Sequence, residues 1–183
     1  MIKPHWLLAV LIGVFLSSAA LAAPPPGFWQ NPVIKDAGAM HPLPQGAFQP
    51  DKTTVYKVVF AVTRAQKKDE PDDGLEPVAR AVNVFASAGV PIEHLKFVAL
   101  ISGGATPIAL DNAHYKKQFG VDNPNLKVIS ELKAAGVEVV VCGQAVAGFG
   151  YQYDWINPDV QVALSALSTS IILQHEGYAL MPL

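Results

Sequence analysis

The chain has 183 residues, of which 51% are hydrophobic, and its formal net charge at pH 7 is −2. It contains neither a basic stripe nor a basic tail, so nucleic acid and an anionic membrane surface are not expected as partners. Cys142 is its one cysteine, which excludes an internal disulfide framework and leaves stability to the burial of apolar groups.

The first 22 residues have the pattern of a cleavable export signal. Lys3 gives a basic start, an apolar run covers residues 6–16, and Ala20-Leu21-Ala22 fits an A-x-A cleavage site. We therefore expect cleavage after Ala22, a periplasmic or secreted protein, and no stable membrane insertion after cleavage. A retained anchor is the alternative, although the run is shorter than the roughly 18–20 residues that span a bilayer.

Residues 23–54 are expected to form a Pro-rich leader. Three consecutive prolines at 24–26 favour polyproline II, and no apolar period continues for more than a few residues. Phe28, Trp29 and Phe48 nevertheless supply large apolar surfaces. Two interpretations stay open, because Pro-rich segments are often unstructured while aromatics are depleted in disorder. The leader is either a disordered spacer or a strap that docks on the domain or on a neighbouring subunit.

A single domain is predicted for residues 55–183, and its first half alternates strands with helices. In chain order, the pattern predicts a buried strand at 56–62, an amphipathic helix at 75–88, a strand at 95–101, a turn at 102–105 and a helix at 107–118. Gly89 ends the first helix, and Pro91 lies just beyond it.

The second half continues the alternation. A helix at 123–135 is expected to have Asn123 as its N-cap and Pro124 at its first position. A strand at 137–141, a helical turn at 145–148 and an aromatic loop at 151–158 follow. Residues 160–164 are expected to form a short strand, with a helix from Asp159 as the alternative. A helix at 169–175 and an edge or central strand at 178–181 end the chain. This order predicts βαβ units and a mainly parallel sheet covered on both faces.

The candidate site lies at the carboxyl ends of the predicted strands, where α/β folds bind ligands. Ser102-Gly103-Gly104 follows the second strand and Cys142-Gly143-Gln144 follows the third. Backbone N–H groups of the turn after Cys142 could stabilise a thiolate. An isolated cysteine at the end of an apolar strand is also commonly a buried core residue, so both interpretations stay open.

Other chemistries receive less support. The histidines are scattered without a paired spacing, so no metal site is expected, and no cofactor is expected either. His114 is either a base near the crevice or a partly exposed helix residue. No G-x-S-x-G elbow is present, which argues against a serine hydrolase.

From Tyr56 to the C-terminus, the chain resembles the DsrE/DsrF-like family of sulfur-relay proteins. The matching segments are residues 56–60, 78–83, 101–105, 123–125, 132–136, 139–144, 164–166 and 177–179. The resemblance is closest to an exported, single-domain branch with a signal peptide and a Cys-Gly-Gln segment. It implies a three-layer α/β/α sandwich with a mostly parallel sheet of about five strands. It also implies a homo-oligomer, a trimer or a hexamer.

In better-known members of that family, a cysteine after a central strand carries sulfur as a persulfide and passes it to a partner. Cys142 is the matching position, so we expect an exported sulfur carrier or sulfur-compound-binding protein that meets a donor or acceptor protein. Gly143 and Gln144 would contact the sulfur anion, and Gly103, Gly104 and Asn123 would form the facing wall. Any catalysis would be sulfur transfer rather than hydrolysis.

Two alternatives remain. In the first, the domain is a non-catalytic small-ligand-binding or assembly module with Cys142 buried, and Tyr151, Tyr153 and Trp155 line a pocket. In the second, Cys142 is exposed and forms an intermolecular disulfide as a redox sensor. The accessibility of the thiol separates these readings.

Overall fold

The computed structural model describes residues 23–65, 67–71 and 74–183. The predicted export signal, residues 1–22, lies outside the described residues. The strands are β1 (Tyr56–Val62), β2 (Leu95–Ile101), β3 (Glu138–Cys142), β4 (Gln161–Ala163) and β5 (Ala179–Pro182). The α-helices are α1 (Leu75–Ser87), α2 (Asn112–Phe119), α3 (Leu126–Ala134), α4 (Gly143–Gly148) and α5 (Ala166–His175). Short 3-10 helices are η1 (Ile92–His94), η2 (Gly103–Ala109) and η3 (Tyr153–Trp155).

The five strands form one sheet in the order β4-β3-β2-β1-β5, and every pairing is parallel. β1 and β2 have the predicted bounds and pair along their whole length, from Tyr56 opposite Leu95 to Val62 opposite Ile101. Both are nearly continuous apolar runs, as strands covered on two faces require. β5 pairs with β1 alone and is an edge strand.

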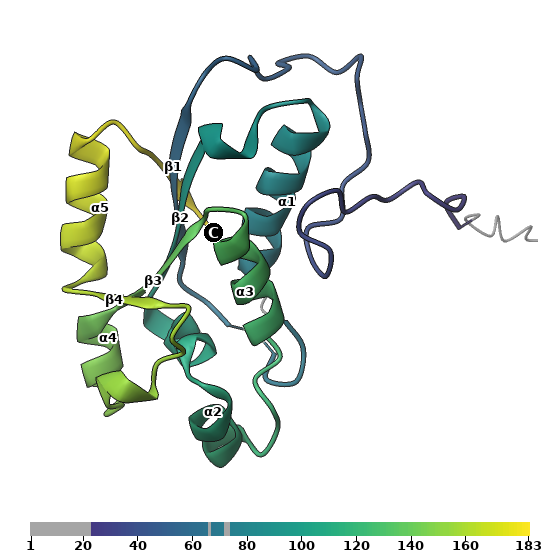
Figure 1. Cartoon of the computed structure of the whole chain (residues 1–183). Helices are drawn as coiled ribbons and strands as arrows, with labels where there is room; N and C mark the ends of the chain where they lie inside the picture. The colour runs from purple at the N-terminus through teal and green to yellow at the C-terminus, as the bar shows by residue number, and fades with distance from the viewer. Residues whose placement is uncertain (1–22, 66, 72–73) are drawn as a thin grey trace, which may run out of the picture.

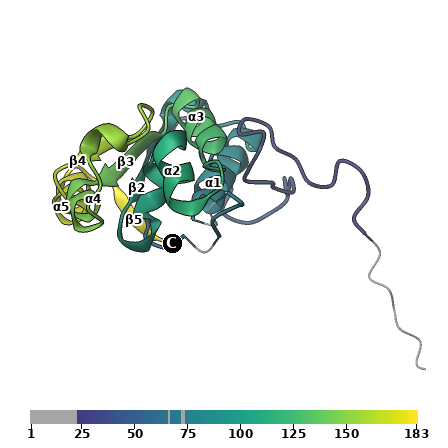
Figure 2. The ribbon, with the colours of Figure 1, turned by 90° about the horizontal axis from the view of Figure 1, so that it is seen from below.

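The connections explain how the helices are distributed (Figure 1). From β1 to β4 the chain steps across the sheet in one direction, and β5 then returns to the far side of β1. Because parallel crossovers are right-handed, the reversal moves the last connecting helix to the opposite face. α1 and α3 accordingly cover one face and α5 covers the other, as Figure 2 also shows. The predicted three-layer α/β/α sandwich is confirmed.

The core is divided by the sheet. The larger part lies between the sheet and the helices α1 and α3, and includes Leu75, Phe97 and Leu132. The smaller part consists of Val59, Val98, Leu100 and Val140, with Ala166 and Leu173 of α5 packed against it. No residue of α5 is itself buried. Among the described residues, no helix combines the length and apolarity needed to cross a membrane.

The helix predicted at 107–118 was wrong in its first half. The chain instead forms η2, passes through an extended Leu110, and starts α2 only at Asn112. Leu110 bridges to Ile156, and the Asp111 carboxylate caps α2 by accepting the His114 N–H. These contacts to a distant loop override the local helical pattern.

The predicted start of α3 was also wrong. Asn125, not Asn123, is the N-cap residue, and Pro124 therefore lies before the helix. Asn123 is buried and holds the preceding loop together. Its Nδ2 donates to the carbonyls of Ile108 and Leu110 at 3.0 and 2.7 Å. Its Oδ1 accepts from the backbone N–H and the side chain of Asn125.

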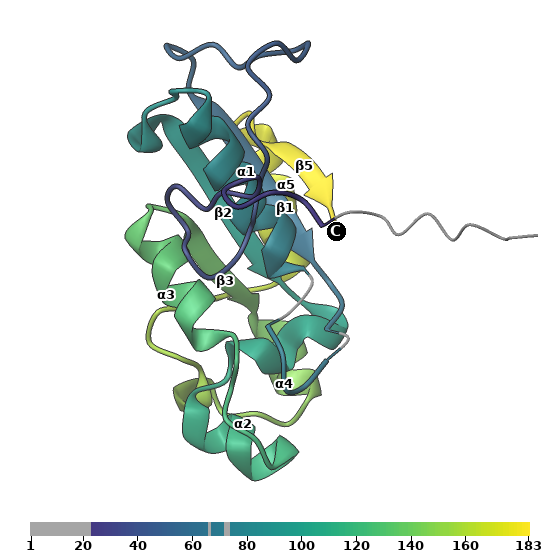
Figure 3. The same cartoon turned by 90° about the vertical axis from the view of Figure 1, so that its right-hand side faces the viewer.

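Part of the leader is a docked strap, residues 31–40, which lies along α1 (Figure 3). Ile34 is fully buried, and the buried Asn83 of α1 clamps the strap. Asn83 Oδ1 accepts the N–H groups of Val33 and Ile34, both at 2.9 Å, while its Nδ2 faces three strap carbonyls at 3.0–3.1 Å. The aromatics Trp29 and Phe48, which suggested docking, are exposed. The strap is held instead by the buried Ile34 and by hydrogen bonds between its backbone and the Asn83 side chain.

Candidate functional site

Cys142 occupies the switch point of the sheet. After β3 the chain passes through α4 and a loop whose Ile156 and Val160 join the larger core, whereas after the neighbouring β4 it continues into α5, which packs against the smaller core. Adjacent strands whose connections leave to opposite faces open a crevice at their carboxyl ends, the usual binding place in open α/β sheets. Cys142 is the last residue of β3 and pairs with Ala163 of β4.

The sulfur of Cys142 is held at the start of α5. Its Sγ accepts the backbone N–H of Ala166, the first residue of that helix, at 3.2 Å. Ser165, the N-cap, accepts the Ser168 N–H through its own hydroxyl. The residue Cys142 is 6% exposed. An N–H donor and the positive end of a helix dipole both stabilise negative charge on a sulfur atom in this position.

Gly143 and Gln144 directly follow Cys142 and begin α4. They line a shallow hollow of about 200 Å³ together with Tyr153, Val162, Ala163 and Leu164. A Cβ on Gly143 would approach the Ala163 carbonyl oxygen to 2.6 Å, so the close contact of β3 and β4 requires glycine. The Gln144 side-chain amide donates to the Leu164 carbonyl at 3.2 Å. Gln144 thus joins the two sides of the crevice.

Of the predicted facing wall, Gly103, Gly104 and Asn123, only the two glycines lie at the carboxyl ends of the strands. Gly103 and Gly104 follow β2, the neighbour of β3, but their closest contact is the Thr63 carbonyl at the end of β1. Gly103 has φ +53, which suits glycine at this sharp turn. The Asn123 side chain, by contrast, forms the hydrogen bonds to the Ile108 and Leu110 carbonyls and to Asn125. The structure thus groups Cys142, Gly143 and Gln144, and gives Asn123 a scaffolding role.

Three residues near Cys142 were not predicted as site residues from the sequence: Leu164, Ser165 and Ala166. A serine after a strand and before an apolar run is an N-cap signal. The prediction missed it because the helix was expected to begin at Thr169. Their proximity to Cys142 depends on the pairing of β3 with β4, which no local pattern reveals.

His114 belongs to a separate cluster with the aromatic loop. Its ring stacks on Trp155, with centroids 4.5 Å apart, and its Nδ1 lies 2.9 Å from both carboxylate oxygens of Asp111. Burial alone would raise the pKa of Asp111, but the hydrogen bonds from His114 hold it below its usual value. No contact joins His114 to Cys142 among the described residues. His114 therefore matches the second interpretation, a partly exposed helix residue, and forms a pair with Asp111 at the start of α2.

Tyr151 and Trp155 likewise pack away from the sulfur, and only Tyr153 lines the hollow beside Cys142. The Tyr151 hydroxyl is buried, and among the described groups none makes a well-aligned hydrogen bond to it. Burial raises the pKa of Tyr151, and the nearby Gln118 side chain offsets part of that rise. The pocket envisaged for the three aromatics is thus not formed by them together.

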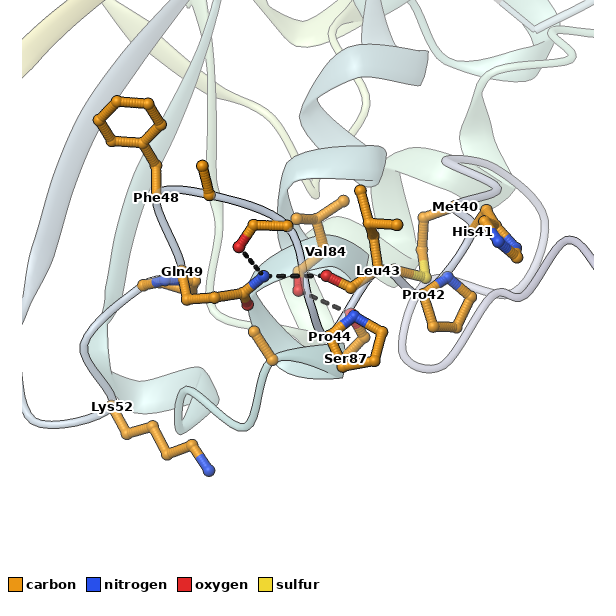
Figure 4. A pocket seen from close by; sticks show the side chains of 14 residues that line it. Met40, His41, Pro42, Leu43, Pro44, Phe48, Gln49, Lys52, Val84 and Ser87 are labelled. Carbon is orange, nitrogen blue, oxygen red and sulfur yellow. Dashed lines mark hydrogen bonds between the residues drawn. The ribbon is translucent and has the colours of Figure 1, made fainter.

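A larger hollow, of about 560 Å³, lies between the leader and α1 rather than at the switch point (Figure 4). Met40, Leu43 and Val84 give it an apolar floor, and Gln49 ties its rim by donating to the Leu43 and Gly46 carbonyls. Its lining includes no cysteine. Within the described ranges, no group of three or more His, Cys, Asp or Glu side chains is arranged to hold a metal ion.

Comparison with known proteins identifies one family. The family model described as DsrE/DsrF-like matches residues 57–183, and no curated protein matches the chain. Among solved structures, a protein of unknown function from Methanobacterium thermoautotrophicum, MTH1491, is similar with a TM-score of 0.48 and 20% identity. That match covers 70% of this chain and 99% of the other. Since the family model matches well over half of the chain, including Cys142, the chain belongs to the DsrE/DsrF-like family.

Proposed function

We propose that this protein is an exported sulfur-relay protein that carries sulfane sulfur as a persulfide on Cys142. Membership of the DsrE/DsrF-like family supports a role related to sulfur relay in general terms. The observation that carries the finer proposal is the position of Cys142 Sγ at the β3–β4 switch point, 3.2 Å from the first N–H of α5. That N–H stabilises the anionic sulfur that both thiolate and persulfide present.

The reaction needs no cofactor. The Cys142 thiolate attacks the outer sulfur of a donor persulfide, a new S–S bond forms, the donor S–S bond breaks, and the donor leaves as a thiolate. In the second step, an acceptor thiolate attacks the outer sulfur of the Cys142 persulfide, and Cys142 leaves as the thiolate. Each step exchanges one S–S bond for another, so no external oxidant or reductant is consumed.

The charge around the site favours one class of donor. Residues 134–183 include no lysine or arginine, and this segment supplies β3, α4, β4 and α5. A dianion such as thiosulfate would therefore find no cationic partner on these elements, and binding such an anion usually needs one. A persulfide or polysulfide chain with a single charge fits the apolar hollow between Tyr153, Val162 and Leu164 better.

Sulfur loading can be measured directly. After treatment with polysulfide, intact mass should show a gain of about 32 Da for one bound sulfur atom, and cyanide should remove it as thiocyanate. The Cys142→Ser variant should gain nothing. Ser168→Ala, which keeps the thiol and changes a neighbouring hydroxyl, should load like the unmodified protein. Loading of Cys142→Ser would place the sulfur elsewhere and refute the proposal.

The burial of Cys142 favours a second candidate function. With Cys142 only 6% exposed, the domain could be a non-catalytic binding or assembly module in which this residue only fills the crevice. A small thiol reagent separates the two functions. If it labels the native protein on the timescale of sulfur loading, the carrier is supported. If it labels only the denatured chain, the assembly module is supported.

Export is tested on the same preparation. A protein recovered from the periplasm or medium with Ala23 as its first residue would support the predicted cleavage after Ala22. Recovery of an uncleaved, membrane-bound chain would support the retained anchor.

A further inference from the structure

The hollow between the leader and α1 has the size of a small-molecule site, and the sulfur chemistry proposed above makes no use of it. Its volume of about 560 Å³ falls within the roughly 300–1,000 Å³ that such sites occupy. Most of the 14 residues that line it are apolar, as is usual for sites that bind small molecules (Figure 4). We call this hollow the leader pocket.

The leader side of this pocket is a loop closed by its own hydrogen bonds. The Gly46 N–H donates to the Leu43 carbonyl at 3.0 Å, and the Gln49 side-chain amide donates to the Leu43 and Gly46 carbonyls at 2.9 and 3.0 Å. The opposite side is the last turn of α1, where the Ser87 hydroxyl donates to the Val84 carbonyl. Both walls are formed without a ligand, and a preformed site loses less conformational entropy on binding.

Phe48 is a large apolar side chain that borders the leader pocket and stays outside it. It is 103% exposed, and Figure 4 shows its ring directed away from Gln49. Its φ is +56, a left-handed value that a residue with a Cβ rarely adopts, and no other non-glycine residue of the described ranges has a positive φ. Strained residues gather at ligand clamps. A ring that turns over a bound ligand accounts for both the strain and the exposure.

The lining of the leader pocket has one cation and no anion. Lys52 is the lysine among the lining residues, and none of them is acidic. Within the described ranges, the Lys52 ammonium forms no ion pair and no hydrogen bond. It lies beside the C-terminal end of α1, because a Cβ on Gly89 would be 3.1 Å from its Nζ. A single negative charge beside Lys52 therefore complements this lining.

Two neighbouring titratable groups leave that charge pattern unchanged. The Asp51 carboxylate accepts the N–H and the hydroxyl of Thr53, both at 2.7 Å, and it does not line the pocket. His41 does line the pocket, but its ring stacks on Phe28 and its Nδ1 lies 2.9 Å from the Phe28 carbonyl oxygen. Neither group is paired with Lys52.

From the apolar lining and this charge we propose that the leader pocket binds a monomeric amphiphile with one apolar chain and one carboxylate, as in a medium-chain fatty acid. In Figure 4, Phe48 and Lys52 lie on opposite sides of Gln49. The apolar chain packs on Met40 and Val84. Its carboxylate meets the Lys52 ammonium, and the Phe48 ring closes over the chain. This proposal does not depend on the sulfur chemistry.

The shape of the site favours a free amphiphile over a bilayer surface. An element that lies in a bilayer interface buries an outward apolar face and carries lysine or arginine on its polar face. The apolar floor of the leader pocket is recessed instead, with Met40 5% exposed, and residues 37–50 include no lysine or arginine. Vesicle binding is therefore the outcome from which the experiment has to separate the proposal.

Isothermal titration calorimetry with sodium decanoate, kept below its micelle concentration, tests the pocket in the purified protein as cells produce it. One decanoate should bind per chain. Val84→Glu places a carboxylate in the floor and should weaken binding at least about tenfold, because like charges then face each other. The matched control is Val121→Glu, a valine outside the lining that is 36% exposed against 39% for Val84, and it should bind decanoate normally. If circular dichroism shows that Val84→Glu does not fold, Leu43→Glu on the opposite wall replaces it.

Two further variants test the two ends of the pocket. Lys52→Gln should weaken decanoate binding about threefold, as expected for an exposed ion pair, and leave 1-decanol binding unchanged. An equal loss for 1-decanol would overturn the assignment of the carboxylate to Lys52. Phe48→Ala should weaken decanoate and 1-decanol alike and several-fold, because both lose the ring that covers the chain. Unchanged binding would overturn the role of Phe48.

An unmodified protein that binds no decanoate, by calorimetry and by equilibrium dialysis, would overturn the proposal. So would unchanged binding in the folded Val84→Glu and Leu43→Glu variants. Sedimentation with phosphatidylcholine vesicles, in a protein that binds no decanoate, would show instead that the leader contacts a bilayer. Polysulfide loading should be the same in all these variants, so a failure of the pocket and a failure of the sulfur carrier are told apart.

Discussion

The two faces of the sheet are covered in different ways. On the α1 and α3 side, the helices bury their inner residues completely, and the strap covers α1. Their outer residues are charged and form exposed ion pairs such as Arg80–Glu76 and Lys127–Asp36. On the other side, α5 buries none of its own residues, and apolar groups face outward.

The strands beneath α5 are nevertheless buried, with Val59 and Leu100 at most 1% exposed. One helix is therefore enough to cover this face of the sheet, while the helix itself stays uncovered. The first face is thus completed by helices and a strap of the same chain, whereas on the second face α5 keeps exposed apolar side chains on its outer side. The predictions below test that difference in packing, in order of decreasing effect.

The same substitution on the two faces should have very different costs. Leu132→Ala removes a fully buried side chain of α3 and should lower the free energy of unfolding by about 2–5 kcal/mol. Leu167→Ala on α5 should change it by less than about 0.5 kcal/mol in dilute, monomeric protein. Urea titrations at low concentration measure both. Equal losses would contradict the comparison, because they would mean that α5 is as closely packed as α3.

Removing the strap clamp should be the next most damaging change. Asn83→Ala leaves two N–H groups and three carbonyls of the strap without their buried partner, and should cost about 2–4 kcal/mol. Asn31→Ala, which removes a single bond to the Ala37 carbonyl, is the control and should cost about 1 kcal/mol. Proteolysis within residues 31–40 should accelerate only in Asn83→Ala. A strap that stays protected in that variant would show that Ile34 alone holds it.

Substitutions of two glycines in α4 test how closely β3 and β4 approach each other at the switch point. Gly143→Ala places a Cβ 2.6 Å from the Ala163 carbonyl and should cost about 1–3 kcal/mol by forcing β3 and β4 apart. Gly148→Ala meets nothing within 4 Å and should be neutral or stabilise the helix by up to about 1 kcal/mol. Thermal unfolding distinguishes them. A tolerated Gly143→Ala would mean that the crevice is looser than the structure shows.

The smallest expected effect is a loss of stability at high pH, caused by one tyrosine on each side of the sheet. Burial, together with Glu138 and Glu176, raises the pKa of Tyr178 under α5, and burial raises the pKa of Tyr151 on the other side. Below the ordinary value of about 10, both folded and unfolded states keep the phenol neutral. Above it the unfolded state ionises first, so stability should fall as pH rises towards the folded pKa.

Urea unfolding between about pH 9 and pH 11 measures this fall. Tyr178→Phe and Tyr151→Phe should each flatten the curve, and the double variant should flatten it most. If both single variants reproduce the curve of the unmodified protein, the loss arises from other groups.

Much of the domain was predictable because its strands are local apolar runs. β1 and β2 begin and end where hydrophobic stretches meet polar residues, and their burial needs no information from elsewhere in the chain. The errors came where distant groups compete for the backbone. Leu110 pairs with Ile156 and Asn123 bonds to η2 carbonyls, so the expected helix starts were displaced. A local pattern contains no signal for such bonds.

The candidate site also has one part that was predictable from the sequence and one part that was not. A cysteine beside glycine at a strand end was predictable as a candidate, because carboxyl ends of parallel strands share one edge. The donor that touches the sulfur, Ala166 N–H, is 24 residues further along the chain. It was not predictable, since its position depends on which strand lies beside β3.

The sequence by itself determined the alternation of strands and helices, the single thiol and the family resemblance, because these follow from local hydrophobic period and residue identity. Only the tertiary structure decided that β5 returns beside β1. That return sends α5 to the opposite face, opens the crevice at Cys142, and leaves Leu167 and Ile171 uncovered. Because parallel crossovers are right-handed, the order of strands in the sheet decides which face a connecting helix covers. No short segment of sequence contains that order.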